Sequence, residues 1–460
     1  MKVVATLIFV LICSILQTKC DDCNESQSEA MRNGILLLTP LIEKGCTVLA
    51  KSLAAVEPQH FSGLESYSGF ITVKEKYFSN LFFWFFPKQN RTENSPWIIW
   101  LQGGPGFSSM VGLFDIMGPL EMQDNQVKLR NVTWASNYSL LFIDNPVGAG
   151  FSFTADDRGY TTNEDAVGGQ LYTFLQQFLD VFPEFRKAPL FVAGQSYAGK
   201  YVPALAIQIH RHRNDQKPVR LGGCIMGNAL IDPRNMMAYS SLCGELGLVT
   251  EYHLEELEKL EQSVVQLIDE QRMIDASNKF NETIEYIKEI SGVNIYNFLK
   301  DPSFGAPQFE HFIQRADVRS WIHVGDTRFV LNNQLVYQKM LPDIMNSTRP
   351  FVEELLEFYP ILVYSGQLDL IIPYSLTKRS HDMFRWSGSK EFRMARRRLL
   401  KRSGRVEAYK KSGGNLEEVL IRGGGHMVAV ENPSVTKFVV DQFINSTLHN
   451  VKDLQGTELI

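Results

Sequence analysis

Short apolar runs recur along the chain, and most of them carry no polar residues at alternate positions. Such runs are typical of strands that are buried on both faces. Two early runs, at 66–73 and 80–86, are rich in aromatic and β-branched residues and predict a pair of strands. The other predicted strands are 96–102, 138–145, 189–194, 221–229, 359–366 and 417–424.

Segments with helical spacing of apolar residues lie between several of these runs, at 163–181, 199–213 and 433–444. Strands that alternate with helices favour a mostly parallel sheet that is covered by helices on both faces. We therefore expect an α/β fold.

Residues 236–320 depart from this alternation. Apolar residues recur there at spacings of three and four, as in an amphipathic helix; they are Leu254, Leu257, Leu260, Val264, Leu267 and Ile268. We expect a helical cap inserted into a sheet domain that consists of residues 21–235 and 321–460. Such a cap can wall off a pocket, or it can be an elaboration without a role in function.

The first 20 residues, MKVVATLIFVLICSILQTKC, predict a secretory signal peptide that is cleaved near Cys20. An uncleaved anchor is the alternative, but the apolar stretch is short and polar residues follow it at once. No later apolar run approaches the roughly 18 residues that cross a bilayer. Seven N-x-[ST] sequons agree with a secreted or lysosomal protein. They are Asn24, Asn90, Asn131, Asn137, Asn281, Asn346 and Asn445.

Four cysteines follow the predicted signal peptide, an even number that would allow two disulfides. The simplest pairing joins Cys23 to Cys46 and Cys224 to Cys243. For Cys224, which lies in the apolar run GGCIMGNA, a buried free thiol is the alternative.

The 460 residues have an ordinary globular composition, with 44% hydrophobic and 21% charged residues. The formal charge of −5 gives no sign of a nucleic-acid partner. The strongly basic run at 391–411 is expected to be a solvated helix face, with an anionic partner or a proteolytic processing site as alternatives.

Candidate chemistry begins at the stretch FVAGQSYAGK, which runs from a predicted strand into a predicted helix. Its centre, Gly194 to Ala198, nearly matches the G-x-S-x-G pattern of a nucleophile elbow around Ser196. Short strings of this kind also occur by chance in ordinary turns. A nucleophilic serine further needs a base and a carboxylate, in the chain order serine, acid, histidine. Asp369 and His426 meet this order, each just after a predicted strand.

An oxyanion hole would complete this chemistry, because the charge that develops on a carbonyl oxygen needs preorganised N–H donors. The N–H of Tyr197, after the serine, is one expected donor. The glycine-rich loop WLQGGPGFSS would supply the other from Gly104, while Gly103 lets the backbone approach the substrate. A phosphate-binding loop is disfavoured, because no Lys-Ser or Lys-Thr pair follows.

Six segments in this order resemble the serine carboxypeptidase family, and its vitellogenic-carboxypeptidase-like branch in particular: WLQGGPGFSS, FIDNPVGAGFSF, GQSYAGKYVPA, GNALIDP, YSGQLD and GGGHMV. The resemblance covers roughly residues 65–445. It implies an α/β-hydrolase fold, release of C-terminal amino acids from peptides with a free C-terminus, and no metal or cofactor. It also implies a lysosomal, vacuolar or secreted setting, and a homodimer as one form to test for.

By motif, the resemblance assigns Ser196 as nucleophile, His426 as general base, and Asp369 as the residue that orients the imidazole. Gly104 and Tyr197 would hold the oxyanion. Gln102, Gly103, Gln195 and Met427 would border the substrate, with Met427 beside the leaving residue.

The resemblance fails at the positions that bind the substrate carboxylate. The family usually has Asn at position 102 and Glu at position 195, where this chain has glutamine. A second family Glu falls on Ile116, next to Asp115, and a common family cysteine falls on Phe107. Because glutamine donates a hydrogen bond without titrating, we expect carboxylate binding that is weakened and independent of acid.

Two other functions stay open on the sequence alone. One is an altered hydrolase or acyltransferase that acts on esters or amides. The other is a secreted homologue without turnover.

Overall fold

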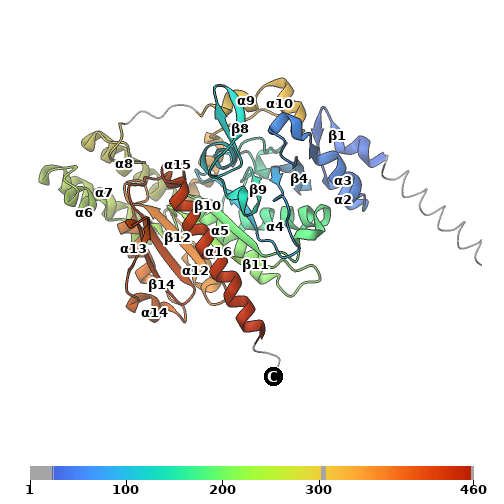
Figure 1. The fold of residues 1–460 in the computed structure, drawn as a ribbon. Coiled ribbons are helices and arrows are strands. Elements are labelled where there is room, and N and C mark those ends of the chain that lie inside the picture. Colours follow the sequence, from blue (N-terminus) through green and yellow to red (C-terminus); the bar gives the residue numbers. More distant parts are fainter. Residues whose placement is uncertain (1–22, 24, 302–306, 457–460) are drawn as a thin grey trace, which may run out of the picture.

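The computed structural model describes Cys23, residues 25–301 and residues 307–456, and one large sheet dominates this part of the chain (Figure 1). The predicted signal peptide and Asn24 lie outside the described residues. The predicted strands are present in the sheet, and several strands that the sequence pattern did not indicate extend it at its edges. In chain order the eleven strands described are β3 (Ala55–Val56), β4 (Ser66–Lys74), β5 (Ser79–Phe86), β6 (Trp97–Leu101), β9 (Ser139–Ile143), β10 (Leu190–Gln195), β11 (Leu221–Gly227), β12 (Ile361–Gly366), β13 (Arg398–Arg402), β14 (Arg405–Gly413) and β15 (Leu416–Ile421).

The order of the strands in space is β13-β14-β15-β12-β11-β10-β6-β9-β5-β4-β3. Every neighbouring pair from β15 through β9 is parallel, while the pairs outside this block are antiparallel. The carboxyl ends of β10, β12 and β15 therefore meet at one edge of the sheet, as the placement of Ser196, Asp369 and His426 requires.

Both faces of the sheet are buried, and alternate residues of a strand belong to different cores. In β6, Trp97 and Ile99 pack on one side, and Ile98 and Trp100 pack on the other. Helices α4 (Glu164–Val181) and α5 (Ala198–Arg211) cover the first side, and α16 (Pro433–Gly456) covers the second (Figure 1). This double covering explains why the strands are apolar throughout.

Three helices from the predicted cap project together at one side of the sheet (Figure 1): α6 (Tyr239–Glu245), α7 (Glu251–Asp269) and α8 (Met273–Ser291). Leu257, Leu260, Val264 and Ile268 form the buried stripe of α7. The stretch thus contains the amphipathic helix that its spacing predicts.

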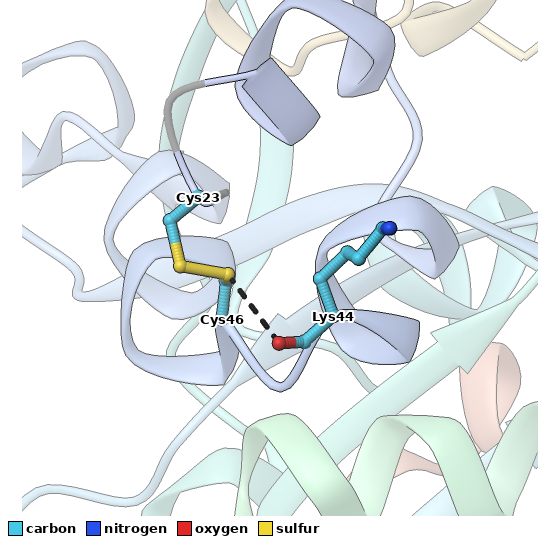
Figure 2. Close-up of a disulfide and its surroundings, with 3 residues drawn as sticks. All are labelled: Cys23, Lys44 and Cys46. Carbon is cyan, nitrogen blue, oxygen red and sulfur yellow. Dashed lines mark hydrogen bonds between the residues drawn. A yellow bond between two sulfur atoms is a disulfide. The ribbon is translucent and has the colours of Figure 1, made fainter. Parts of the chain in front are cut away.

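Only one of the two expected disulfides is present among the described residues. Cys23 and Cys46 are joined, and the Cys46 sulfur also lies 3.7 Å from the carbonyl oxygen of Lys44 (Figure 2). The Cys224–Cys243 pairing is wrong, because both are buried free cysteines, one in β11 and one in α6. Burial raises the pKa of both thiols, to about 12 for Cys224 and about 11 for Cys243, so both are protonated and unreactive at neutral pH.

The basic run at 391–411 is not a helix face, which corrects a second expectation. Helix α14 (Ser389–Met394) ends at its start, and β13 and β14 then form an antiparallel hairpin at the edge of the sheet. Exposed cations on an edge strand oppose pairing with another sheet, so the charges fit this position as well as they fit a solvated helix.

Candidate active site

Ser196 lies in the tight turn between β10 and α5. Its φ of +65° is in the left-handed region, which a non-glycine residue occupies at a cost on the order of 1–3 kcal/mol. Three backbone contacts hold the turn. The Ser196 N–H donates to the Gly227 carbonyl at 2.9 Å, and the Ser196 carbonyl accepts from the N–H groups of Gly199 at 2.9 Å and Leu230 at 3.1 Å. This is the geometry of a nucleophile elbow.

The small residues around Ser196 are required by close packing. A β-carbon at Gly194 would lie 2.7 Å from the Ala198 β-carbon, and one at Gly199 would lie 2.7 Å from the Ala229 β-carbon. Both separations are too short for real atoms, so larger side chains would force the turn open.

Asp369 follows β12 and is 2% exposed. Four donors surround its carboxylate. The backbone N–H groups of Ile371 and Ile372 donate to Oδ1 at 2.9 and 3.1 Å. The Asn228 side-chain amide donates to Oδ2 at 2.6 Å, and the His426 Nδ1 lies 2.7 Å from the same oxygen. The side chain is therefore held in one orientation.

His426 follows β15 and is also 2% exposed. Its backbone N–H donates to the Tyr296 carbonyl at 2.6 Å, and the Tyr296 ring packs edge-on against the imidazole at 5.1 Å. Because Nδ1 donates to Asp369, Nε2 is left as the acceptor in the neutral ring. Ser196 and His426 both line one cavity of about 960 Å³, so the free nitrogen and the hydroxyl belong to a shared space.

The glycine-rich loop after β6 lies directly against the elbow. A β-carbon at Gly103 would be 2.6 Å from the Tyr197 nitrogen and 2.9 Å from the Ser196 β-carbon. Among the described residues, no hydrogen bond engages the backbone N–H of Gly104 or of Tyr197. Gly104 lines the cavity and Tyr197 directly follows Ser196, so both unused donors remain candidates for an oxyanion hole.

Asp144, which directly follows β9 and lies near the start of the segment FIDNPVGAGFSF, holds this loop in place. Its Oδ1 accepts hydrogen bonds from the Ser108 hydroxyl at 2.6 Å and from the Ser109 N–H at 2.9 Å. Its Oδ2 accepts from the Phe151 N–H at 2.9 Å. Two of the sequence segments noted above therefore act as one structural unit.

Three of the predicted substrate-binding residues, Gln102, Gln195 and Met427, line the cavity. The Gln195 amide nitrogen lies 2.9 Å from the Met427 sulfur, and its buried oxygen has no partner within the described chain. Gly103, the fourth, lies behind this surface against the elbow. An unpaired buried acceptor beside Ser196 is available to a ligand.

Asp115, and not Ile116, faces the cavity. Ile116 is 1% exposed in the apolar core, whereas Asp115 lines the cavity together with Glu121 and Arg130. Burial raises the pKa of Asp115 to about 6, and the Arg130 guanidinium offsets part of this rise. Arg130 itself lies 3.4 Å from Glu121 and donates to the Gly118 carbonyl at 3.1 Å. The cavity thus contains a carboxyl that titrates near neutral pH, which the expectation of acid-independent binding did not include.

Comparison with known proteins identifies the family. The model of the serine carboxypeptidase family (Peptidase_S10) matches residues 57–446. This chain belongs to the serine carboxypeptidase family. A venom serine carboxypeptidase of Apis mellifera is 38% identical over 424 residues, covering 89% of this chain and 91% of the relative. The vitellogenic carboxypeptidase of Aedes aegypti is 37% identical, covering 90% of each chain, and a probable serine carboxypeptidase of Homo sapiens, CPVL, is 37% identical, covering 89% of each.

The fold agrees with that of a solved carboxypeptidase. The crystal structure of Kex1Δp, a prohormone-processing carboxypeptidase from Saccharomyces cerevisiae, matches with a TM-score of 0.78 at 23% identity. The match covers 86% of this chain and 96% of that chain. The expected α/β-hydrolase fold is confirmed, and the family and its relatives support a serine carboxypeptidase, which is a hydrolase.

Two further residues of the candidate site were not predicted from the sequence. Asn228 contacts Asp369 across 141 positions, and Tyr296 reaches His426 from the segment after α8. The GNALIDP segment marks Asn228 by resemblance, but no pattern marks Tyr296. The contact between Tyr296 and His426 depends on how the helical insertion packs on the sheet.

Proposed function

We propose that this protein releases C-terminal amino acids from peptides through Ser196, His426 and Asp369. One observation carries the proposal: the 2.7 Å contact between His426 Nδ1 and Asp369 Oδ2, made by a histidine that shares its cavity with Ser196. This contact leaves Nε2 to accept the serine proton.

In the proposed first step, the Ser196 oxygen bonds to the last peptide carbonyl carbon while its proton passes to His426 Nε2. The tetrahedral intermediate then breaks its C–N bond, and the imidazolium returns the proton to the leaving nitrogen, which releases the terminal residue. Water repeats the sequence on the ester, so Ser196 regains its proton and the shortened peptide departs. The free N–H groups of Gly104 and Tyr197 would stabilise the oxyanion in both halves.

Recognition of the terminal carboxylate is proposed to rest on neutral donors and on Asp115. The Gln102 and Gln195 side chains would donate from their amide groups. Asp115 is mostly protonated below about pH 6 and could then donate as well, whereas above this pH its charge would repel the substrate carboxylate. Affinity for peptides would therefore fall as the pH rises through about 6.

The helical stretch 236–320 is proposed to act as a cap. Lys288 at the end of α8 and the following residues Val293 to Tyr296 line the cavity, which supports a role in substrate selection. Variation in this stretch would then change the preferred terminal residue while leaving the chemistry intact.

A secreted or lysosomal destination is proposed from the signal peptide and the sequons. Among the described residues no helix has both the length and the apolar character that a membrane crossing needs. Asn90, Asn131 and Asn445 are exposed and are the proposed glycosylation sites. The other described sequons are half-buried and bonded within the chain; for example, the Asn137 amide donates to Asp441 at 3.0 Å.

Two assays on the purified protein test the proposed function. A fluorophosphonate should label Ser196, and C-terminal ladder sequencing of a peptide library should show stepwise loss of terminal residues. Labelling without peptide trimming, together with turnover of esters, would favour an altered hydrolase or acyltransferase instead. Absence of labelling would point to a homologue without turnover.

A further inference from the structure

A second cluster of polar side chains contacts the side chain of Tyr197 and is buried among three helices. Lys200 in α5 is 0% exposed, and its ammonium lies 2.7 Å from Oδ2 of Asp343 in α11 (Gln334–Ile344). The same ammonium donates to the Asp343 carbonyl and to the Ile344 carbonyl at 3.5 Å. A lysine has three N–H donors, so these three acceptors occupy all of them.

A second carboxyl, that of Glu164, joins this cluster from the first residue of α4 and is 3% exposed. No hydrogen bond of ordinary geometry reaches either of its oxygens from the described residues. The charge of Lys200 acts on the Glu164 carboxyl as well, but the hydrogen bonds of its ammonium are made to Asp343 and Ile344. Taking an unpaired carboxylate out of water is costly, so the second carboxyl is expected to keep its proton.

The titratable groups around Glu164 agree with this balance. Burial raises its pKa to about 8; Lys200 lowers the pKa, Asp343 raises it, the Tyr197 hydroxyl lowers it, and Asp165 raises it. The neutral form therefore predominates at pH 7.

Tyr197 connects this cluster to the oxyanion hole. Its hydroxyl donates to Asp343 Oδ2 at 3.3 Å, its ring lies 5.0 Å from the Lys200 ammonium, and the Tyr201 ring packs edge-on against it at 5.1 Å. The backbone N–H of the same residue is a proposed oxyanion donor. The cluster therefore contacts the side chain of the residue whose main-chain N–H is proposed to bind the oxyanion.

We propose that Glu164 is a positioning residue, which must hold a proton for the Lys200–Asp343 pair to keep Tyr197 in place. Ionisation of Glu164 would add a second buried anion that competes with Asp343 for the single ammonium. The Tyr197 side chain would lose its fixed partner, and the oxyanion donor would shift. This inference rests on the proposed function for its catalytic part, whereas the protonation of Glu164 can be tested without turnover.

The first test compares thermal unfolding of Glu164→Gln with that of the unchanged protein from pH 5 to 9. Because the native state keeps a proton that the unfolded chain releases above about pH 4.5, the unchanged protein loses stability as the pH rises, until about pH 8. Glutamine removes this loss, so the variant's advantage should grow between pH 5 and 8 by on the order of 10³-fold in the folding equilibrium and then stay constant. Asp165→Asn, at the exposed neighbouring position, should show no such growth. A pH-independent difference between Glu164→Gln and the unchanged protein would overturn the protonation.

The second test measures kcat and KM from pH 6 to 9.5 on a blocked dipeptide. The unchanged protein should lose kcat through about pH 8 with little change in KM, because the oxyanion donor acts in the transition state, and Glu164→Gln should keep its plateau. Tyr197→Phe retains the backbone N–H but lacks the hydroxyl; it should have a lower kcat without this alkaline decline. An identical alkaline decline in Tyr197→Phe or in Glu164→Gln would overturn the positioning role. If Ser196 is not labelled by a fluorophosphonate while the thermal result holds, the proposed function fails and the buried proton stands.

Discussion

His426 and Met427 are neighbours in the chain, yet they contact two regions that differ in how their polar groups are hydrogen-bonded. The His426 ring is held by Asp369, whose carboxylate is surrounded by four donors. The Met427 sulfur faces Gln195, whose amide oxygen is buried without a partner in the described chain. We call the first region the catalytic rim (Ser196, Asn228, Asp369, His426) and the second the recognition wall (Gln102, Asp115, Gln195, Met427).

The difference follows from what each region does. In the catalytic rim, Asp369 and His426 are already held in one orientation, since a base must be oriented before the proton moves. The recognition wall leaves the buried Gln195 amide oxygen unpaired beside the cavity, where a ligand would satisfy it, whereas the unpaired oxygen of the rim, Asn228 Oδ1, belongs to a residue that does not line the cavity. Substitutions in the rim should therefore reduce kcat, while those in the wall should change KM and its pH dependence.

The largest effect is expected from Ser196→Ala in the catalytic rim. Removing the nucleophile should lower kcat by on the order of 10⁴- to 10⁶-fold, because the acyl-enzyme can no longer form on this residue. Steady-state hydrolysis of a blocked dipeptide measures this loss. The thermal midpoint should not fall, and retention of substantial turnover would remove Ser196 from the mechanism.

A smaller loss is expected from Asn228→Ala, which removes one of the four donors to Asp369. Loss of a buried hydrogen bond to a charged group costs roughly 1–3 kcal/mol, or about 10- to 100-fold in kcat. The separate measurement of kcat and KM tests whether the rim alone is affected. An increase in KM at constant kcat would place Asn228 with the recognition wall instead.

Gln195→Glu tests the recognition wall by restoring a titrating side chain at a fully buried position. Burial would raise the pKa of the new carboxyl, so at pH 5 it would be a neutral donor to the substrate carboxylate. We expect kcat/KM at pH 5 to stay close to that of the unchanged protein, because one neutral donor replaces another, and to fall about tenfold at pH 7.5, where the charged carboxylate no longer donates. A profile parallel to that of the unchanged protein would show that position 195 does not meet the carboxylate.

The smallest effect is expected from Asp115→Asn. Above about pH 6 the unchanged side chain is charged, and a repulsion of roughly 1 kcal/mol corresponds to about fivefold in KM. The ratio of variant to unchanged kcat/KM should therefore be near one at pH 5 and rise through about pH 6, since other titrations cancel in the ratio. A ratio that is constant with pH would mean that Asp115 does not act on the substrate.

Much of the fold could be predicted because the signals are local. The apolar runs at 189–194 and 359–366 needed only their own composition to predict β10 and β12, and the spacing around Leu257 predicted α7. The basic hairpin was missed because its sequence carries no such local signal. A run of arginines has no periodicity of its own, and its strand structure comes from pairing with β15.

The candidate site divides in a similar way. Ser196, Asp369 and His426 could be proposed from order and position, because each follows a strand and parallel strands bring their ends together. Asn228, Tyr296 and Asp115 could not, because their partners lie in other segments. A register difference of one residue decides that Asp115 faces the cavity and Ile116 the core.

By itself, then, the sequence indicated the family, the alternating strands and helices of the central sheet, and the three residues proposed for catalysis. The tertiary structure decided that Cys224 and Cys243 stay apart, which carboxyl enters the cavity, and that Glu164 lies beside a lysine already engaged by Asp343. The physical reason is that strand and helix preferences act between near neighbours in the chain. Burial, charge balance and hydrogen-bond pairing depend on groups that only folding brings together.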